Sequence, residues 1–131
     1  MPCICYWIDD DEILRCLLVN QLTHAGHSVD ESADGSAALA RINAGSYDAV
    51  ICDWEMPKLD GPALCRAVRC GRHGRDLYFI MLTGRDTAIA QADGYDAGID
   101  AFLTKPCEMT DLLAALRTAQ SISSMPRRKA S

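Results

Sequence analysis

Short apolar runs alternate with segments of helical periodicity along most of the chain, and this alternation constrains the fold more than any other feature. Runs with the length and composition of β-strands cover residues 4–8, 27–32, 48–52, 77–82 and 101–103. Between these runs, apolar residues recur three and four positions apart, as in helices that pack by one face. Strands that alternate with helices form a parallel sheet whose two faces the helices cover. We therefore expect an α/β fold with five parallel strands and five helices.

This arrangement is the flavodoxin-like doubly wound sheet, with an expected strand order of 2-1-3-4-5. The second run is polar, which is typical of an edge strand that must not pair with other chains. The helix expected at about 87–97 is rich in alanine and poor in large apolar residues, so it should pack less firmly than the others. The last helix is expected at about 108–120. Residues 1–120 should thus form one domain, and 121–131 a flexible tail or the stump of a linker.

Length and composition exclude several classes of protein. The 131 residues suit one domain with a substantial core, and the net charge of -5 lacks the basic character that direct nucleic-acid binding requires. No apolar stretch approaches the roughly 20 residues of a membrane span, and no signal peptide precedes the first strand. We therefore expect a cytoplasmic protein that binds neither nucleic acid nor membrane directly. The seven cysteines lack metal-binding spacing, which favours reduced thiols that pack as small hydrophobic side chains.

Polar residues suited to chemistry stand where the expected strands end. Asp9 and Asp10 follow the first strand, Asp53 the third, Thr83 the fourth and Lys105 the fifth. The carboxyl ends of parallel strands line one crevice, and ligands bind there. We expect these side chains to converge on one pocket that holds a divalent cation and a phosphoryl group.

The three aspartates suit a magnesium ion. Carboxylates brought together repel one another unless a cation lies among them. Magnesium needs only one or two protein carboxylates, keeps several waters and accepts phosphate oxygens as its remaining ligands. Magnesium and Lys105 together would balance the charges of Asp9, Asp10 and Asp53. A solvated acidic turn would explain any one of these aspartates, but it explains their joint placement poorly.

Asp53 is the strongest candidate for a nucleophile. A carboxylate can attack a phosphoryl group to form an acyl phosphate, while the metal ion and Lys105 neutralise the transferring oxygens. Thr83 offers a hydroxyl to a phosphoryl oxygen, although threonines at strand ends are common for structural reasons. The proline at position 57 forces an extended turn that could aim the backbone carbonyl of Glu55 at the cation. Gly61 permits a tight reversal of the chain into the next helix.

Taken in order, these motifs resemble the receiver domain of bacterial two-component response regulators. The resemblance covers about residues 3–120. It rests on the acidic pair Asp9–Asp10, the D-x-x-M-P-x-x-D-G pattern over 53–61, Thr83, and the pair Lys105–Pro106. Each motif alone is weak, whereas all four in order and at the family's spacing are specific. The resemblance implies a signalling switch rather than an enzyme.

The resemblance also implies roles for individual residues. Asp53 would accept a phosphoryl group from a histidine kinase or a phosphotransfer protein. Mg²⁺ would be bound by Asp10, Asp53 and the backbone carbonyl of Glu55, with Asp9 in the outer coordination shell. The Lys105–Pro106 peptide bond would be cis.

The expected switch consists of Thr83 and Phe102, and it would change the surface formed by the fourth helix, last strand and fifth helix. A downstream output domain or protein would read that change, and dimerisation on phosphorylation is a further expectation. The segments D-W-x-M-P, L-C-R and L-T-x-x-D are most similar to receivers fused to diguanylate cyclases. Some positions depart from the family pattern. Cys107 replaces a usual aromatic residue, Trp54 is large beside the phosphoacceptor, and Phe102 lacks the hydroxyl of a tyrosine.

Two other classes of protein share part of this pattern. Phosphohydrolases of the haloacid dehalogenase type also use an aspartate nucleophile, and the segment 53–55 loosely matches their D-x-D motif. Their additional metal carboxylates come late in the chain, however, whereas here an acidic pair precedes Asp53. A flavin-binding module of the same fold would need a phosphate loop rich in Ser, Thr and Gly after the first strand. Residues 9–12 are all acidic instead and would repel a phosphate.

Overall fold

The computed structural model describes residues 4–45, 47–54, 59–71, 77–84, 97–104 and 108–123. Strands and helices alternate in the order β1 (Ile4–Ile8), α1 (Glu12–His24), β2 (Ser28–Ser32), α2 (Gly35–Ala44), β3 (Ala49–Asp53), α3 (Gly61–Arg69), β4 (Tyr78–Thr83), β5 (Ala101–Thr104) and α5 (Met109–Ser123). The helix predicted at 87–97 lies outside the described residues, apart from Ala97.

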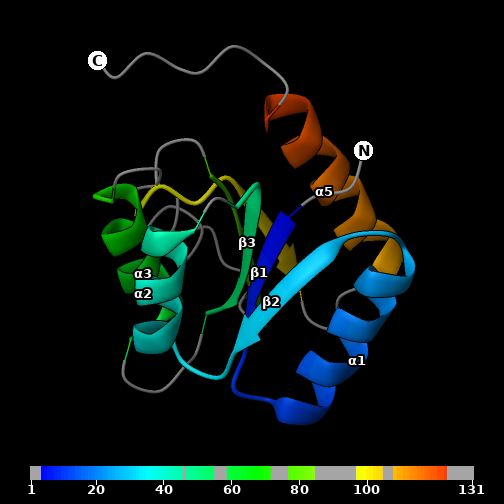
Figure 1. Cartoon of the computed structure of the whole chain (residues 1–131), viewed down its shortest axis with the longest axis horizontal. Helices are drawn as coiled ribbons and strands as arrows, with labels where there is room; N and C mark the ends of the chain where they lie inside the picture. Colours follow the sequence, from blue (N-terminus) through cyan, green and yellow to red (C-terminus); the bar gives the residue numbers. More distant parts are fainter. Residues whose placement is uncertain are drawn as a thin grey trace.

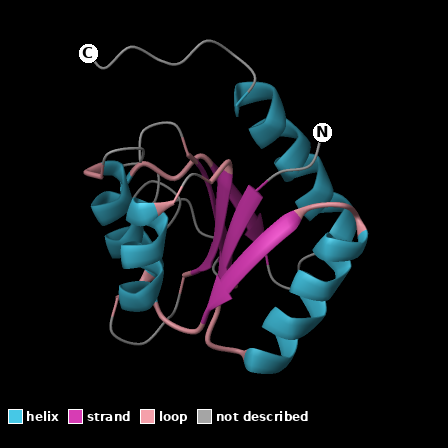
Figure 2. Cartoon of the chain, in the orientation of Figure 1, coloured by secondary structure: helices cyan, strands magenta, loops and turns pink. Residues whose placement is uncertain are grey.

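The strands form one parallel sheet in the order β2-β1-β3-β4-β5, which confirms the predicted flavodoxin-like topology. Figure 1 shows α1 and α5 on one face of the sheet and α2 and α3 on the other. The same three layers are clear in Figure 2, where the magenta strands lie between the cyan helices. β3 lies at the centre of the sheet and is buried along its whole length, as expected for a strand covered on both faces. The polar β2 lies at the edge, as predicted.

The pleat of the strands divides the core into two clusters. Along β1, Cys5 and Trp7 point into the cluster shared with α1 and α5. Tyr6 and Ile8 point into the cluster shared with α2 and α3. Successive side chains of a strand alternate between the faces of a sheet, so an apolar strand such as β1 anchors helices on both sides. This packing fixes where the strands end, and therefore where the polar residues that follow them lie.

Helix α1 packs by a narrower stripe than its apolar residues suggest. Leu18 and Leu22 are buried, whereas Ile13 and Leu17 are 84% and 53% exposed. Positions four apart share a helix face, and Ile13 and Leu17 precede the buried stripe by one residue, about 100° away around the helix axis. The apolar pattern therefore predicted the helix correctly but not which of its residues reach the core.

Other sequence predictions differ in detail from the structure. Helix α5 continues to Ser123, beyond the predicted end at residue 120. Asp53 and Thr83 are the last residues of β3 and β4 rather than the first residues after them. Cys5, Cys52 and Cys65 are buried thiols as predicted, but Cys16 and Cys70 are exposed. Within the described residues, none of the helices has both the length and the apolar character that a membrane span requires.

Candidate functional site

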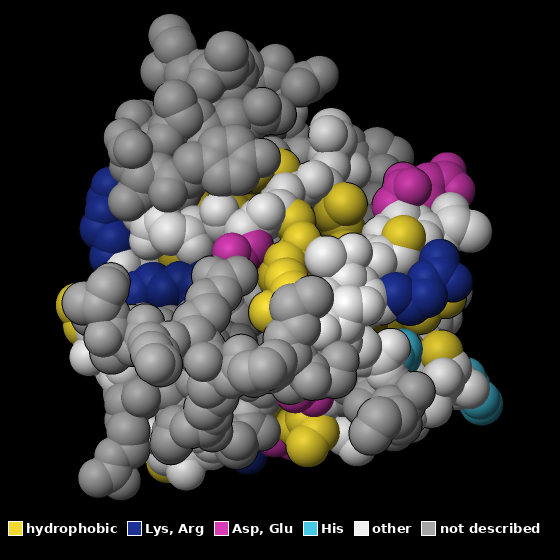
Figure 3. Space-filling model, turned by 90° about the horizontal axis from the view of Figure 1, so that it is seen from above, with side chains coloured by type: hydrophobic (Ala, Val, Ile, Leu, Met, Phe, Trp, Pro, Cys, Tyr) yellow, Lys and Arg dark blue, Asp and Glu magenta, His cyan; other side chains and the backbone are white. Residues whose placement is uncertain are grey.

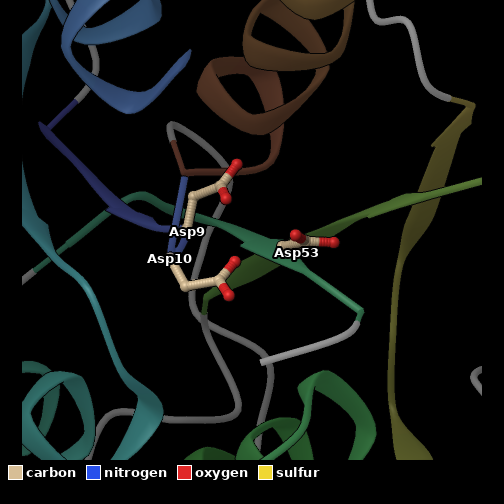
Figure 4. Close-up of side chains that lie close together, drawn as sticks. All are labelled: Asp9, Asp10 and Asp53. Carbon is tan, nitrogen blue, oxygen red and sulfur yellow. The ribbon is translucent and has the colours of Figure 1, made fainter. Parts of the chain in front are cut away.

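The carboxyl ends of β1 and β3 bring three aspartates together. Asp9, Asp10 and Asp53 each place a carboxylate oxygen within 4.8 Å of the others. Figure 4 shows the three side chains gathered at the ends of these two neighbouring strands. Asp9 is fully buried, Asp53 is 5% exposed, and Asp10 is exposed. The sequence prediction that these residues converge is thus realised in the structure.

The loop between β1 and α1 is fixed by its own acidic side chains. Asp9 Oδ1 accepts a hydrogen bond from the Asp11 backbone N–H (3.0 Å). Asp11 is the N-cap of α1, and its Oδ1 accepts from the Leu14 backbone N–H (3.1 Å). A carboxylate cap suits the positive end of the helix dipole. The third aspartate of the acidic run is therefore a structural residue, which frees Asp10 to face the pocket.

The chain after β3 is held against β4 and α3. The Trp54 N–H donates to the Leu82 carbonyl (2.9 Å), and the Gly61 N–H donates to the Trp54 carbonyl (3.0 Å). Asp60 caps α3, since its Oδ1 accepts from the Ala63 N–H (3.0 Å). The aspartate and glycine that end the D-x-x-M-P-x-x-D-G motif thus both position the start of α3 beside Asp53.

Gly61 is required here by close packing. A Cβ at Gly61 would lie 2.5 Å from the Met81 sulfur and 3.1 Å from the Asp53 carbonyl oxygen. The sequence had suggested a tight turn, but among the described glycines only Gly26 and Gly98 have positive φ. The lack of a side chain, rather than an unusual backbone conformation, lets α3 approach the end of β3.

Thr83 lies on the strand next to the phosphoacceptor candidate. Leu82 pairs with Asp53 across the sheet, so Thr83 is one residue beyond that pair and is only 3% exposed. On the far side, Thr83 pairs with Thr104 of β5. The predicted switch residue Phe102 belongs to the same strand β5. Its ring lies 6.2 Å from the Trp54 ring, centroid to centroid, with 32° between their planes. Trp54 and Phe102 are separate departures from the family pattern in the sequence, and the pattern does not reveal that their rings are in contact.

Several predicted site residues lie outside the described residues. These are Lys105, the backbone carbonyl of Glu55, and the pair Pro106 and Cys107. Their roles stay predictions from the sequence. The predicted cis Lys105–Pro106 bond and most of the predicted fourth helix also lie outside the described residues.

Cys52, the neighbour of Asp53 on β3, is expected to be unreactive. Burial raises the pKa of the Cys52 thiol well above its usual value, and the adjacent Asp53 carboxylate raises it further. The Cys52 thiol lies 3.2 Å from the Asp53 carbonyl oxygen and donates to it. A thiol that stays protonated is a poor nucleophile, so Cys52 does not compete with Asp53 for an electrophile.

The donor set fits a magnesium ion. All three groups offer carboxylate oxygen, the ligand type that this hard cation prefers. Oxygens this close together can share one ion, either directly or through its bound water. Three converging carboxylates also need a counter-charge. Mg²⁺ therefore matches both the ligand type and the charge of the pocket.

Comparison with known proteins places this geometry in a family. The sequence model of the response regulator receiver domain matches residues 6–117, from β1 into α5. The chain belongs to this family. The matched range includes Asp9, Asp10 and Asp53.

Individual relatives resemble most of this receiver domain. The transcriptional regulatory protein TcrA from Mycobacterium tuberculosis is 37% identical over 120 residues, which are 92% of this chain and 47% of TcrA. The chain spans about half the length of the curated relatives it matches. The chemotaxis response regulator CheY4 of Vibrio cholerae has a TM-score of 0.85 at 28% identity, over 91% of this chain and 99% of that one.

A third comparison concerns the metal. The receiver domain of a sensor histidine kinase from Pseudomonas aeruginosa has a TM-score of 0.81 at 25% identity, over 95% of this chain and all of that one. That structure is described as having a magnesium ion coordinated in its active-site cleft.

Proposed function

We propose that this receiver domain is a phosphorylation-activated switch of a two-component system, in which Asp53 accepts a phosphoryl group in the presence of Mg²⁺. One observation carries the proposal. Asp53 ends the central strand of the sheet, and its carboxylate lies within 4.8 Å of those of Asp9 and Asp10. Family membership supports the general role, and the geometry supports the choice of residue.

The residues present can hold the ion. Asp10 and Asp53 would bind it directly together with the Glu55 carbonyl, and the fully buried Asp9 would act through a bound water. When bound, Mg²⁺ neutralises carboxylates and phosphoryl oxygens that would otherwise repel each other. Asp9 also orders the loop through its bond from the Asp11 N–H, so it would position Asp10 as well as share the charge.

The proposed transfer is an in-line displacement. An Asp53 carboxylate oxygen forms a bond to phosphorus while the bond from phosphorus to the histidine nitrogen of the donor breaks. The imidazole keeps the electron pair and takes up a proton. Lys105 would pair with the phosphoryl oxygens, and the Thr83 hydroxyl would donate to one of them. The position of Thr83, directly after the strand partner of Asp53, supports this role.

The change would then pass to β5. A charge-assisted hydrogen bond from Thr83 to the phosphoryl group contributes about 1.5–3 kcal/mol, and only the phosphorylated state makes it. Such a differential contact is what shifts a conformational equilibrium. Phe102 would respond on the adjacent strand, where its ring contacts Trp54. The surface of the fourth helix, β5 and α5 would present the result.

Partners follow from the chemistry and the relatives. The donor would be a histidine kinase or a phosphotransfer protein, and the reader a downstream output domain or protein in the cytoplasm. Curated relatives such as TcrA are about twice as long as this chain, which supports an output function outside it. A diguanylate cyclase as that output and dimerisation on phosphorylation rest on the sequence alone.

Phosphorylation of the purified chain tests the proposal. Acetyl phosphate with Mg²⁺ should add one phosphoryl group that is lost in acid or base, and Asp53→Ala should add none. Asp111→Ala, an exposed aspartate in the first turn of α5, is the matched control and should behave as wild type. An acid-stable label or a labelled Asp53→Ala variant would exclude the assignment. Rapid turnover of phosphate esters would point instead to a phosphohydrolase.

A further inference from the structure

We propose that Arg15 is a positioning residue of the metal site, holding the peptide group between Asp9 and Asp10 in place. This inference rests on the proposed function, because the ion it concerns is Mg²⁺. Arg15 lies in the first turns of α1, six positions after Asp9. No sequence pattern distinguishes it, because a lone arginine on an amphipathic helix usually faces solvent.

The contact is made to the backbone of the site. Arg15 Nη1 donates to the Asp9 carbonyl oxygen at 2.6 Å, a short and charge-assisted hydrogen bond. That carbonyl and the Asp10 N–H belong to one planar peptide unit. Fixing the direction of the carbonyl therefore fixes the bond from which the Asp10 Cα and carboxylate extend. Asp10 needs this support, because its side chain is exposed while those of Asp9 and Asp53 are buried.

Glu31 holds the guanidinium in the orientation that makes this contact. Glu31 Oε1 accepts from Arg15 Nε at 3.1 Å, which leaves Nη1 directed at the Asp9 carbonyl. The Arg15 side chain is only 13% exposed, whereas that of Glu31 is 38% exposed. β2 itself is tied to the loop, since the Asp9 N–H donates to the Ser32 carbonyl at 3.3 Å. Arg15 thus links the ends of β1 and β2 to the start of α1.

Glu31 also offsets the positive charge of Arg15 beside the metal site. A bare cation beside three carboxylates would compete with Mg²⁺ for them. The paired carboxylate offsets that charge, so the arginine can act as a hydrogen-bond donor without strongly weakening the field at the site. A charge effect of Arg15 and a positioning effect therefore predict opposite changes in Mg²⁺ affinity when Arg15 is removed. If charge dominated, Mg²⁺ would bind more tightly. If positioning dominates, it binds more weakly.

A Mg²⁺ titration separates the two. We would follow Trp54 fluorescence in wild type, Arg15→Gln, Arg15→Lys and Arg41→Gln. Arg41 lies exposed in the last turn of α2, at the opposite edge of the sheet, and carries the same charge change. We expect Arg15→Gln to weaken Mg²⁺ binding about tenfold, the low end for outer-shell partners of a metal site. Arg15→Lys should recover part of the loss, because it keeps one donor, and Arg41→Gln should change little.

A second readout needs no metal. In Mg²⁺-free protein, Arg15→Gln should speed exchange of the Asp11 amide hydrogen, which is bonded to Asp9 Oδ1, while amides of β3 keep their protection. Equal or tighter Mg²⁺ binding by Arg15→Gln would overturn the positioning role. Absence of Mg²⁺ binding by wild type would overturn the proposed function instead. If Arg15→Gln fails to fold, Arg15→Lys carries the test. It keeps the positive charge, so affinity weaker than wild type reports the lost positioning, and wild-type affinity would contradict the role.

Discussion

Charged side chains are arranged differently at the two ends of the parallel strands. We call these ends the carboxyl edge and the amino edge of the sheet. At the carboxyl edge, three carboxylates converge. At the amino edge, charges are matched within the protein. Figure 3 looks onto that edge, and both basic and acidic side chains lie on the face it shows. There Arg69 Nη2 lies 2.6 Å from Asp100 Oδ2, and the same oxygen accepts from the Phe79 N–H at 2.8 Å.

Arg69 completes its hydrogen bonds with backbone carbonyls. It donates to the Leu77 carbonyl at 2.6 Å through Nη1, and to the Gly98 carbonyl through Nε (3.1 Å) and Nη2 (2.6 Å). Gly98 has φ of +101°, and a Cβ there would lie 3.1 Å from the Arg69 side chain. One arginine thus joins the end of α3 to the segments that lead into β4 and β5. The amino edge gains stability from these bonds, while the carboxyl edge gathers the three carboxylates of the candidate metal site.

The largest expected effect comes from a substitution at the carboxyl edge. Asp53→Asn should abolish phosphorylation by acetyl phosphate and yet leave the fold intact. Without Mg²⁺, the loss of one of three neighbouring like charges should raise the free energy of unfolding by about 0.5–2 kcal/mol, as removal of a functional charge often does. Phosphorylation assays and urea unfolding at low Mg²⁺ measure both effects. A variant that is clearly less stable than wild type would show that the three carboxylates are already well compensated in the free protein.

The second effect breaks the amino edge. Arg69→Met keeps much of the apolar stem but leaves the carbonyls of Leu77 and Gly98 and the Asp100 carboxylate without this donor. We expect a loss of about 2–4 kcal/mol in the free energy of unfolding, since hydrogen bonds to charged groups are worth roughly 1.5–3 kcal/mol each. Arg66→Met, an exposed arginine on the same helix, is the matched control and should cost little. Mg²⁺ affinity should be unchanged in both variants, and a weakened site in Arg69→Met would contradict the separation of the two edges.

The sequence predicted these two edges unequally. The carboxyl edge could be anticipated because parallel strands place their following residues together, so motif and topology predicted the convergence of Asp9, Asp10 and Asp53. The Arg69 network could not, because it joins residues that are 29 and 31 positions apart through a backbone carbonyl and one carboxylate. No local pattern marks an arginine that bonds to a carbonyl.

The same reasoning explains what was missed within the site. Arg15 acts on a carbonyl, which has no signature in the sequence. The contact between Trp54 and Phe102 depends on the lateral distance between β3 and β5 across β4, and on side-chain rotamers. Asp60 and Gly61 belonged to a recognised motif, but only the structure shows why the glycine is needed. Contacts of backbone atoms and packing distances are the parts of the site that a sequence leaves open.

A third prediction tests packing at the carboxyl edge. Gly61→Ala should destabilise the protein by about 1–3 kcal/mol, the usual range for overpacking a core, because the new methyl meets the Met81 sulfur and the Asp53 carbonyl. Gly84→Ala is the matched control at the same edge, since a Cβ there meets nothing within 4 Å. The double variant Gly61→Ala/Met81→Ala should lose less stability than the two single variants lose together, because shortening Met81 removes the clash. Full additivity of the two changes would place the strain on the Asp53 carbonyl instead.

The smallest expected effect tests whether the two edges act independently. Mg²⁺ that binds only the folded state should stabilise it by about 1.4 kcal/mol at roughly ten times its dissociation constant. Arg69→Met should show the same increment as wild type, because strands of five residues separate the edges by about 16 Å and distant changes add. Asp10→Asn should show none, since it removes a proposed ligand. Urea unfolding of these three proteins with and without Mg²⁺ measures the three increments directly. A difference of more than about 0.5 kcal/mol between the wild-type and Arg69→Met increments would mean that the edges are coupled through the sheet. In that case, the matched charges of the amino edge would take part in the switch rather than only support it.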